Sequence, residues 1–164
     1  DAGVIGRDIV TDLAVLKIPA ENLPSATIAD ATKIKVGDWV MTMGNALALK
    51  GGPTVTLGIV SGLGRSIQTA RGQFYDLIQT DAAVNIGNSG GPIVNEKGQL
   101  VAIAVSGMAK DITEGLNFGI KSSAAANFLK SNKISPSTGY MSFSTSGDKL
   151  VKLLEESTVY TFCE

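Results

Sequence analysis

Short apolar segments recur along this chain with turn residues between them, and this rhythm restricts the fold more than any other feature. The segments span residues 3–6, 12–18, 27–30, 36–45, 54–67, 74–80, 92–106 and 117–120. Nineteen glycines stand against one Trp, three Tyr and five Phe, which favours many tight turns. Strands at this spacing are typical of all-β barrels or sandwiches. We therefore predict an all-β fold.

Local patterns refine the expected strands. The mostly apolar run DLAVLKI at 12–18 predicts a strand that is buried on both faces or lines a closed barrel. Glycines at 58, 62 and 64 predict bulges or bends within the long strand at 54–67. Residues 95–98, Asn-Glu-Lys-Gly, join two apolar runs into a hairpin.

Helices are expected only near the C-terminus. Ser122 or Ser123 is the expected cap of AAANFLKSNK at 124–133, and Asp148 that of a second helix at 148–157. The second helix has an apolar face of Leu150, Val151, Leu153 and Leu154. We expect it to pack on the β-structure rather than serve a partner.

Charge and composition exclude several functional classes. Fourteen basic and fifteen acidic residues leave a net charge of −1, so no basic footprint for nucleic acid or an anionic membrane is present. The longest apolar run, residues 100–105, is far shorter than the ~20 residues of a membrane helix. The single Cys163 excludes an internal disulfide, and no metal or cofactor motif is found.

The stretch GNSGGP at 87–92 places a serine hydroxyl among residues of minimal bulk or fixed φ. A tight turn of this kind can direct successive backbone N–H groups toward one point, as an oxyanion hole requires. The same residue types also make ordinary surface turns. Residue types alone leave both interpretations open.

The surrounding sequence resembles one protein family. DLIQTDAAVNIGNSGGPIVNEKGQLVAIAV is similar to the nucleophile region of the HtrA/Deg family of trypsin-like serine proteases. TDLAVLKI, VGDWVMTMGN, TVTLGIVSGLGRS and GLNFGI match other motifs of that family in the same order. The resemblance implies a trypsin-like double β-barrel. The expected domains are an incomplete first barrel at 1–45, a second barrel at 46–134 and an extension of unknown role at 135–164.

The resemblance assigns catalytic roles residue by residue. Ser89 matches the catalytic serine, and Asp12 matches the aspartate that orients the base. The backbone N–H groups of Gly87 and Ser89 match the oxyanion hole. Without the motif, Asp12 would be read as a solvated carboxylate at a strand end. Asp8, outside the motif, is interpreted as a turn residue.

Substrate-binding residues are implied in the same way. Ala83 matches the floor of the primary pocket, and its small apolar side chain favours cleavage after small aliphatic residues. Ala104, Val105 and Ser106 match the strand edge that pairs with an extended substrate, although the same residues also suit an ordinary core strand. Asp81 is expected to be a structural hydrogen-bonding residue. Residues 106–115 are expected to form a mobile loop beside the pocket.

The catalytic base is where the sequence departs from the family. The chain contains no histidine, and the family's histidine precedes its aspartate, so the expected position of the base is upstream of residue 1. The chain by itself is then expected to be nearly inactive, and apolar residues such as Val15 and Leu16 are expected to lack their partners. A serine–lysine dyad with Lys17 or Lys121 is a weaker alternative. Ile86 also departs, because the family often has proline there.

The functional prediction is a serine endopeptidase that acts on unfolded or misfolded polypeptides in protein quality control outside the cytoplasm. The alternative is a catalytically inactive, protease-like peptide-binding module. The expected partners are polypeptide substrates, the missing N-terminal segment and, as is usual in the family, copies of the same chain in a homotrimer. The residues after the last helix of the protease part are too few for a further peptide-binding domain.

Overall fold

The computed structural model describes residues 1–45, 52–69, 72–85, 87–105, 116–139, 144–159 and 161. Nine strands and two helices lie in these ranges, which confirms the all-β prediction with helices near the C-terminus. In chain order they are β1 (Gly3–Asp8), β2 (Leu13–Lys17), β3 (Thr27–Ile28), β4 (Trp39–Gly44), β5 (Thr54–Thr69), β6 (Gly72–Thr80), β7 (Pro92–Asn95), β8 (Gln99–Val105), β9 (Asn117–Lys121), α1 (Ser122–Ser131) and α2 (Gly147–Ser157).

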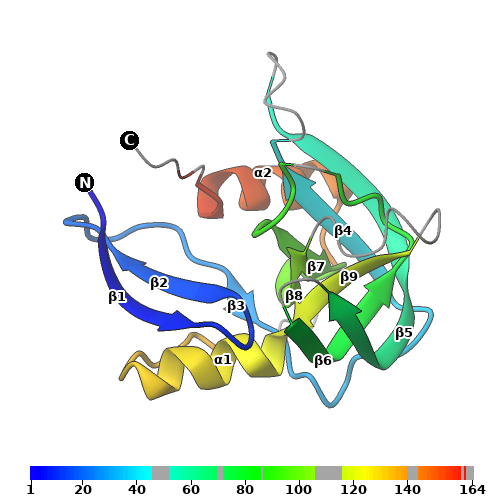
Figure 1. The fold of residues 1–164 in the computed structure, drawn as a ribbon. Helices are drawn as coiled ribbons and strands as arrows, with labels where there is room; N and C mark the ends of the chain where they lie inside the picture. Colours follow the sequence, from blue (N-terminus) through cyan, green and yellow to red (C-terminus); the bar gives the residue numbers. More distant parts are fainter. Residues whose placement is uncertain are drawn as a thin grey trace.

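Six strands form a closed ring (Figure 1). Its order is β8, β7, β4, β5, β6 and β9, and β9 pairs back onto β8. Each neighbouring pair is antiparallel, whereas the short β3 adds to β8 in the parallel direction. Because the ring closes, each of these six strands pairs with a strand on both sides along part of its length, and β7 accompanies β8 only as far as Ile103. The arrangement agrees with the trypsin-like fold that the sequence implies.

The interior of the ring is the main hydrophobic core. Side chains from alternate positions of the ring strands and from nearby loops pack there, and the tightest of them have no exposed surface. The buried members are Ala29, Ile34, Val40, Val60, Ile78, Ala82, Val84, Ile93, Val101, Ala102 and Ala104. At about 25 cal/mol per Å² of apolar surface removed from water, this cluster supplies the main driving force for ring closure.

β1 and β2 pair only with each other, as a hairpin separate from the ring. Helix α1 follows β9, contacts β8 and β9, and runs beneath the hairpin, where it contacts β2 (Figure 1). Only one face of the hairpin is covered: Val15 is half-buried, but Leu16 is 42% exposed. Residues 12–18 are therefore not buried on both faces, contrary to what the apolar run alone suggests, and the exposure of Leu16 agrees with the expectation that it lacks a partner in this chain.

The domain division at residue 45 does not coincide with a change of sheet. β3 and β4 precede residue 45, yet both belong to the seven-stranded sheet that contains the ring. The division itself stays a prediction. The C-terminal residues pack on this sheet, because Thr138 bridges to Ile28 and α2 lies against β4 and β7.

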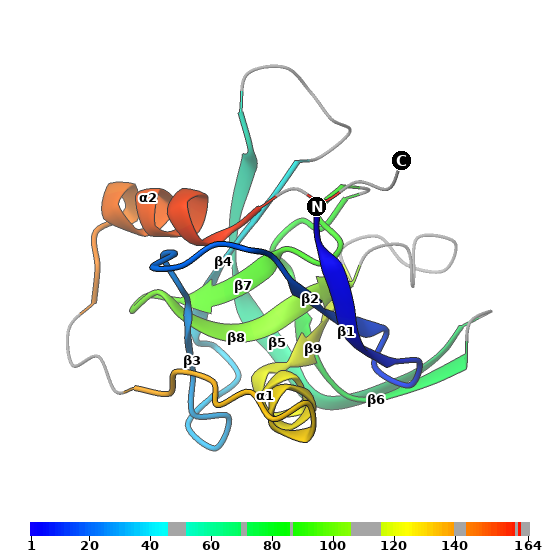
Figure 2. The same ribbon diagram turned by 90° about the vertical axis from the view of Figure 1, so that its left-hand side faces the viewer.

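Helix α2 is attached to the outer surface of the ring, as expected for its amphipathic face. Leu150 and Leu154 are buried in a cluster with Met43 and Val94. Thr145 precedes the helix, and its N–H donates to the Glu96 carbonyl over 2.8 Å. Figure 2 shows α1 and α2 on opposite sides of the closed sheet.

The predicted helix caps were wrong. Helix α1 begins at Ser122 directly after β9, and the buried Ser122 hydroxyl donates to the Ala29 carbonyl over 3.3 Å instead of capping. Helix α2 begins at Gly147, with Ser146 at the cap position and Asp148 in the first turn. A hydrogen bond from Ser146 lowers the pKa of the exposed Asp148. In α1 the continuous strand-to-helix path leaves no room for a separate capping residue.

The glycines of β5 serve two purposes. The register between β5 and β6 shifts on either side of Gly62, which confirms the predicted irregularity at 62 and 64. Gly58 instead pairs in regular register with Val40, so the predicted bend there was wrong. A Cβ at Gly58 would lie 2.3 Å from the Ala82 nitrogen, so this glycine allows a close backbone approach.

Replacing Leu154 tests the packing of α2. Leu154→Ala is expected to lower the free energy of unfolding by about 2–5 kcal/mol, because the leucine is 1% exposed and a cavity would remain. The matched control, Leu57→Ala, removes a side chain that is 59% exposed and is expected to change the free energy by no more than about 0.5 kcal/mol. Urea unfolding measures both, and equal effects would show that α2 does not pack as described.

Candidate active site

Residues 87–91, the Ser89 turn, precede β7 and carry the exposed serine. Gly87 and Gly90 have φ values of +98° and +83°, in the left-handed region that favours glycine. Within the segment the Asn88 N–H donates to the Asn85 carbonyl and the Gly91 N–H to the Asn88 carbonyl, each over 2.9 Å. The N–H groups of Gly87 and Ser89 belong to the residues on either side of Asn88. The glycines therefore fix a turn with a defined backbone path around the hydroxyl.

Strand β8 holds the Ser89 turn through two backbone hydrogen bonds. The Gly90 N–H donates to the Ala104 carbonyl over 2.8 Å, and the Ala104 N–H donates to the Gly91 carbonyl over 2.9 Å. This reciprocal pair uses both backbone groups of Ala104 inside the protein. Ala104 is thus a support of the turn in addition to its predicted place at the substrate edge.

Strand β4 meets the other side of the turn at van der Waals distance. A Cβ at Gly91 would lie 2.2 Å from the Met43 carbonyl oxygen, and a Cβ at Gly44 would lie 2.5 Å from the Asn88 Cα. Both glycines are therefore required by close backbone approach, and the turn is held between β4 and β8. The sequence motif gave no signal for the contact of Gly44 with Asn88, because it joins distant segments.

The Asn88 side chain is fully buried beneath the serine. Among the described residues, neither its amide nitrogen nor its amide oxygen has a hydrogen-bond partner, and the same holds for the buried Thr42 hydroxyl. Buried polar atoms of this kind are normally satisfied, often by ordered water. Sequence reasoning missed Asn88, since asparagine in a glycine-rich turn is more often exposed.

A pocket of about 560 Å³ opens beside Ser89 and is called the Ser89 pocket below. The Ser89 turn forms one wall, and residues 43–45 with 52–53 form another. The third wall comes from Glu155, Thr158, Val159 and Thr161 at the C-terminal end of the described chain. The volume is within the range of small-ligand and peptide side-chain sites. The sequence did not predict this C-terminal wall.

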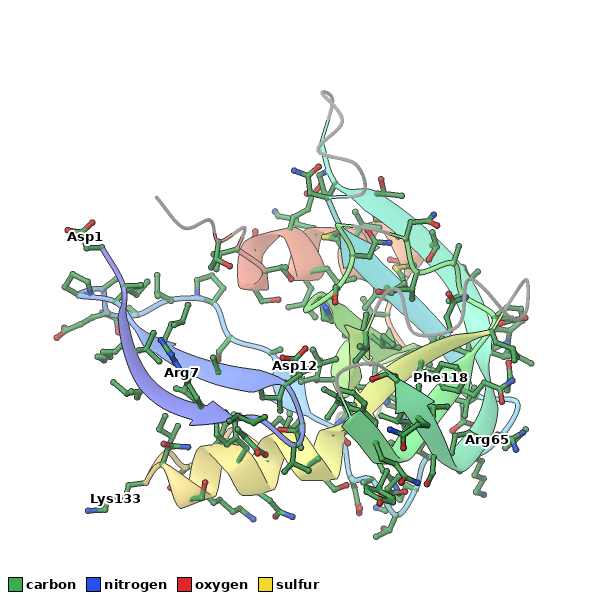
Figure 3. The ribbon with its side chains drawn as sticks, viewed as in Figure 1. Asp1, Arg7, Asp12, Arg65, Phe118 and Lys133 are labelled. Carbon is green, nitrogen blue, oxygen red and sulfur yellow. The ribbon has the colours of Figure 1, made fainter. Side chains whose placement is uncertain are left out.

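Asp12 lies in the turn between β1 and β2, with a φ of +56°. Figure 3 shows it at the end of the hairpin nearer to the ring. Its neighbour Leu13 packs against the buried cluster of Phe74, Leu77, Val105, Phe118 and Ile120. The end of β8 therefore connects both predicted catalytic segments: the backbone of Ala104 holds the Ser89 turn, and Val105 belongs to the cluster that anchors the Asp12 turn.

Asp8 has the turn role expected of it. Its carboxylate accepts hydrogen bonds from the Val10 N–H at 3.0 Å and from the Thr11 hydroxyl at 2.7 Å. The Thr11 hydroxyl lowers the pKa of Asp8, so the carboxylate stays ionised and keeps the turn closed. A well-formed turn limits the positions available to Asp12.

The predicted lysine alternatives do not lie at the site. Lys121 Nζ is 3.4 Å from the Asp76 carboxylate, on β9 and β6. Neither Lys17 nor Lys121 is among the described residues that line the Ser89 pocket. The structure therefore gives the serine–lysine dyad no support.

Of the predicted substrate-binding residues, the described ones do not line the Ser89 pocket themselves, although Ala104 is bonded to the lining residues Gly90 and Gly91. Ala83 is exposed, its carbonyl accepts from the Thr56 hydroxyl over 2.9 Å, and it is not among the described lining residues. Val105 is largely buried in the second cluster. Asp81 accepts from the Ile59 N–H over 2.7 Å, which confirms its structural role. Ile86, Ser106 and the predicted loop at 106–115 lie outside the described residues.

The described ranges contain neither a candidate metal site nor a helix that could span a membrane. No group of three or more His, Cys, Asp or Glu side chains is placed there to hold a metal ion. Among the helices of the same ranges, none has the length and apolar character to cross a membrane.

The closed antiparallel ring and the serine held on a glycine turn define a trypsin-like peptidase domain. The family model described as "Trypsin-like peptidase domain" matches residues 1–103. The chain belongs to this family, and within it to the HtrA/Deg proteases.

Known relatives support this placement. The chain is 46% identical over 131 residues to a "Probable periplasmic serine endoprotease DegP-like" of Chlamydia pneumoniae. The aligned region is 78% of this chain and 26% of that protein. The chain is 41% identical to "Serine endoprotease DegS" of Haemophilus influenzae, covering 79% and 38%. The solved structure "HtrA-type protease AlgW with decapeptide" superposes with a TM-score of 0.71 at 40% identity, covering 80% of this chain and 40% of that one. The chain thus spans between about a quarter and two fifths of these proteins.

Gly91→Ala tests whether the Ser89 turn is held by close backbone approach. The added methyl group would meet the Met43 carbonyl, so the free energy of unfolding is expected to fall by about 1–3 kcal/mol. The control Gly147→Ala adds the same group at an open position in α2 and is expected to leave stability unchanged or raise it by up to about 1 kcal/mol. Thermal unfolding compares them, and a neutral Gly91→Ala would show that β4 does not touch the turn.

Proposed function

We propose that Ser89 is the nucleophile of a serine endopeptidase that acts on unfolded or misfolded polypeptides. The observation that carries the proposal is the turn itself, in which positive-φ glycines and close contacts with β4 and β8 hold one exposed hydroxyl. An ordinary surface turn does not need to be held by neighbouring strands, and it does not need glycines whose Cβ would collide with the backbone of another segment. Relatives named as serine endoproteases provide independent support.

In the proposed reaction Ser89 Oγ attacks the scissile carbonyl carbon while a base takes its proton. Negative charge then develops on the carbonyl oxygen, and the N–H groups of Gly87 and Ser89 stabilise it. The base returns the proton to the leaving amine, and water hydrolyses the acyl-enzyme by the reverse sequence. Loss of one such donor typically costs ~3 kcal/mol of barrier stabilisation, so the backbone path of the turn is part of the catalytic machinery beside the hydroxyl.

The base is proposed to be a histidine of a polypeptide segment outside these 164 residues, because the chain itself contains none. Asp12 would accept the imidazole Nδ1–H, fix the tautomer and stabilise the imidazolium. Its position in a closed turn anchored through Leu13 suits that task. Without the segment, the chain is expected to have almost no activity.

The substrate is proposed to extend along the edge at residues 104–106, on the acyl side of the scissile bond. Ala83 would form the floor beneath a small aliphatic side chain, since a methyl group offers no charge to a lysine or arginine. The location is proposed to be outside the cytoplasm, in protein quality control, in line with the word "periplasmic" in the relatives' names.

Replacing Asp12 tests the proposed triad in a protein that supplies the histidine segment. Ser89 should react with a fluorophosphonate, and Asp12→Asn should slow peptide hydrolysis by about 10⁴-fold, because the imidazole would adopt the wrong tautomer. Asp30→Asn removes an exposed turn carboxylate that accepts from Thr32 and does not line the Ser89 pocket, so it is the matched control and should retain activity. If Ser89 does not react in the intact protein at any pH, the chain is instead a peptide-binding module.

The exposed surface of the β1–β2 hairpin allows a second test of whether a further β segment binds this chain. Its apolar side chains are exposed, among them Val4 at 47%, Ile5 at 51% and Val10 at 67%. Exposed apolar patches and strand edges mark interaction surfaces. The 164-residue chain is therefore expected to bind a histidine-bearing β segment or to associate with copies of itself. Sedimentation measures this, and a stable monomer that binds no such segment would contradict the proposal.

A further inference from the structure

The C-terminal wall of the Ser89 pocket lies outside the region that the family model matches, which ends at residue 103. Glu155 belongs to the last turns of α2, and Thr158 and Thr161 follow the helix. The family resemblance therefore assigns these residues no role. Their position beside the serine is a property of this chain.

Buried packing fixes the wall in place. Leu150 and Leu154 anchor α2 against Met43 and Val94. On the same helix, the Leu153 side chain approaches Gly98 so closely that a Cβ at Gly98 would lie 2.4 Å from it. Met43 is itself a lining residue of the pocket, so the helix and the serine turn contact the same strand. The wall is thus positioned relative to Ser89 through β4.

The lining of the Ser89 pocket fits the leaving-group side of the proposed scissile bond. The proposed acyl side of a substrate follows residues 104–106. Neither Ala104 nor Val105 is among the described residues that line the Ser89 pocket, whereas Gly87, Gly90 and Gly91 are. A substrate polypeptide that continues past Ser89, beyond the β8 edge, would therefore meet this pocket.

The chemistry of the wall selects the residue that fits. Glu155 is the one charged side chain among the described lining residues, and the hydroxyls of Thr158 and Thr161 add acceptors. A cationic side chain in the pocket would meet a carboxylate and no opposing cation in that lining. Because Glu155 is exposed, solvent and salt reduce the attraction.

We propose that α2 and the residues after it form a specificity subsite, in which Glu155 favours a lysine or arginine on the leaving-group side of the scissile bond. The inference rests on the proposed role of Ser89 as nucleophile. It adds a substrate preference that depends on a segment outside the family-matched region.

Peptide binding tests the subsite without requiring cleavage. The test uses two fluorescein-labelled ten-residue peptides with a central valine. One peptide has two lysines after the valine and the other has two glutamates, and they are otherwise identical. The 164-residue chain is titrated into each peptide, and fluorescence anisotropy measures binding. The lysine peptide is expected to bind about threefold to fivefold more tightly at low salt, the range for an exposed ion pair. Glu155→Gln should remove the difference. Glu156→Gln, whose carboxylate lies 3.9 Å from Lys152 Nζ, is the matched control and should keep it.

Each outcome decides the proposal. Equal binding of the two peptides to the parent chain, an unchanged preference in Glu155→Gln, or binding of neither peptide would overturn it. A thermal melt of Glu155→Gln that matches the parent shows that the loss of preference is not a folding defect. The failure of Ser89 to react with a fluorophosphonate would overturn the proposed enzyme but would leave the measured binding preference intact, so the two failures are distinguishable.

Discussion

The site depends on the reciprocal pair of backbone hydrogen bonds that joins Ala104 to Gly90 and Gly91. Backbone bonds of this kind fix the path of the turn whatever side chain it carries, and they place Ser89 at the end of β8. The next residue, Val105, belongs to the cluster against which Leu13 packs, so the same strand end also positions the turn of Asp12. The proposed nucleophile and the proposed triad carboxylate, from distant parts of the sequence, thus share one support.

Strand β4 also supports the candidate site, because it contacts both the Ser89 turn and helix α2. Gly44 allows Asn88 to approach, whereas Met41 and Met43 belong to the cluster that receives α2. Burial of Leu150 and Leu154 consequently fixes the C-terminal wall of the Ser89 pocket relative to the serine. An element that looks like an appendage in the sequence is, through this strand, part of the surroundings of the hydroxyl. Changes in α2 that leave the turn intact can therefore alter what the pocket accepts.

The sequence predicted the elements better than their relations. Apolar runs bounded by glycine located the strands because burial in a sheet requires that pattern locally. The pairing of β9 with both β6 and β8 closes the ring through long-range contacts, which no local pattern encodes. The apolar run at 12–18 indicates a strand that is covered, yet Leu16 is exposed, because a local run carries no information about whether the covering strands are present. At the candidate site, motifs singled out Ser89 and Asp12, but the contact of Gly44 with Asn88 and the approach of Glu155 arise only from tertiary packing.

The Ser89 turn is proposed to stabilise negative charge on a peptide oxygen through the N–H groups of Gly87 and Ser89. This is tested with ¹⁵N-labelled chain and a peptide that ends in a valine carboxylate, whose oxygen mimics that charge. We expect the amide proton resonances of Gly87 and Ser89 to shift downfield on binding, and to shift much less with the same peptide amidated at its C-terminus. Equal shifts with both peptides, or binding that leaves these two resonances unchanged, would contradict it.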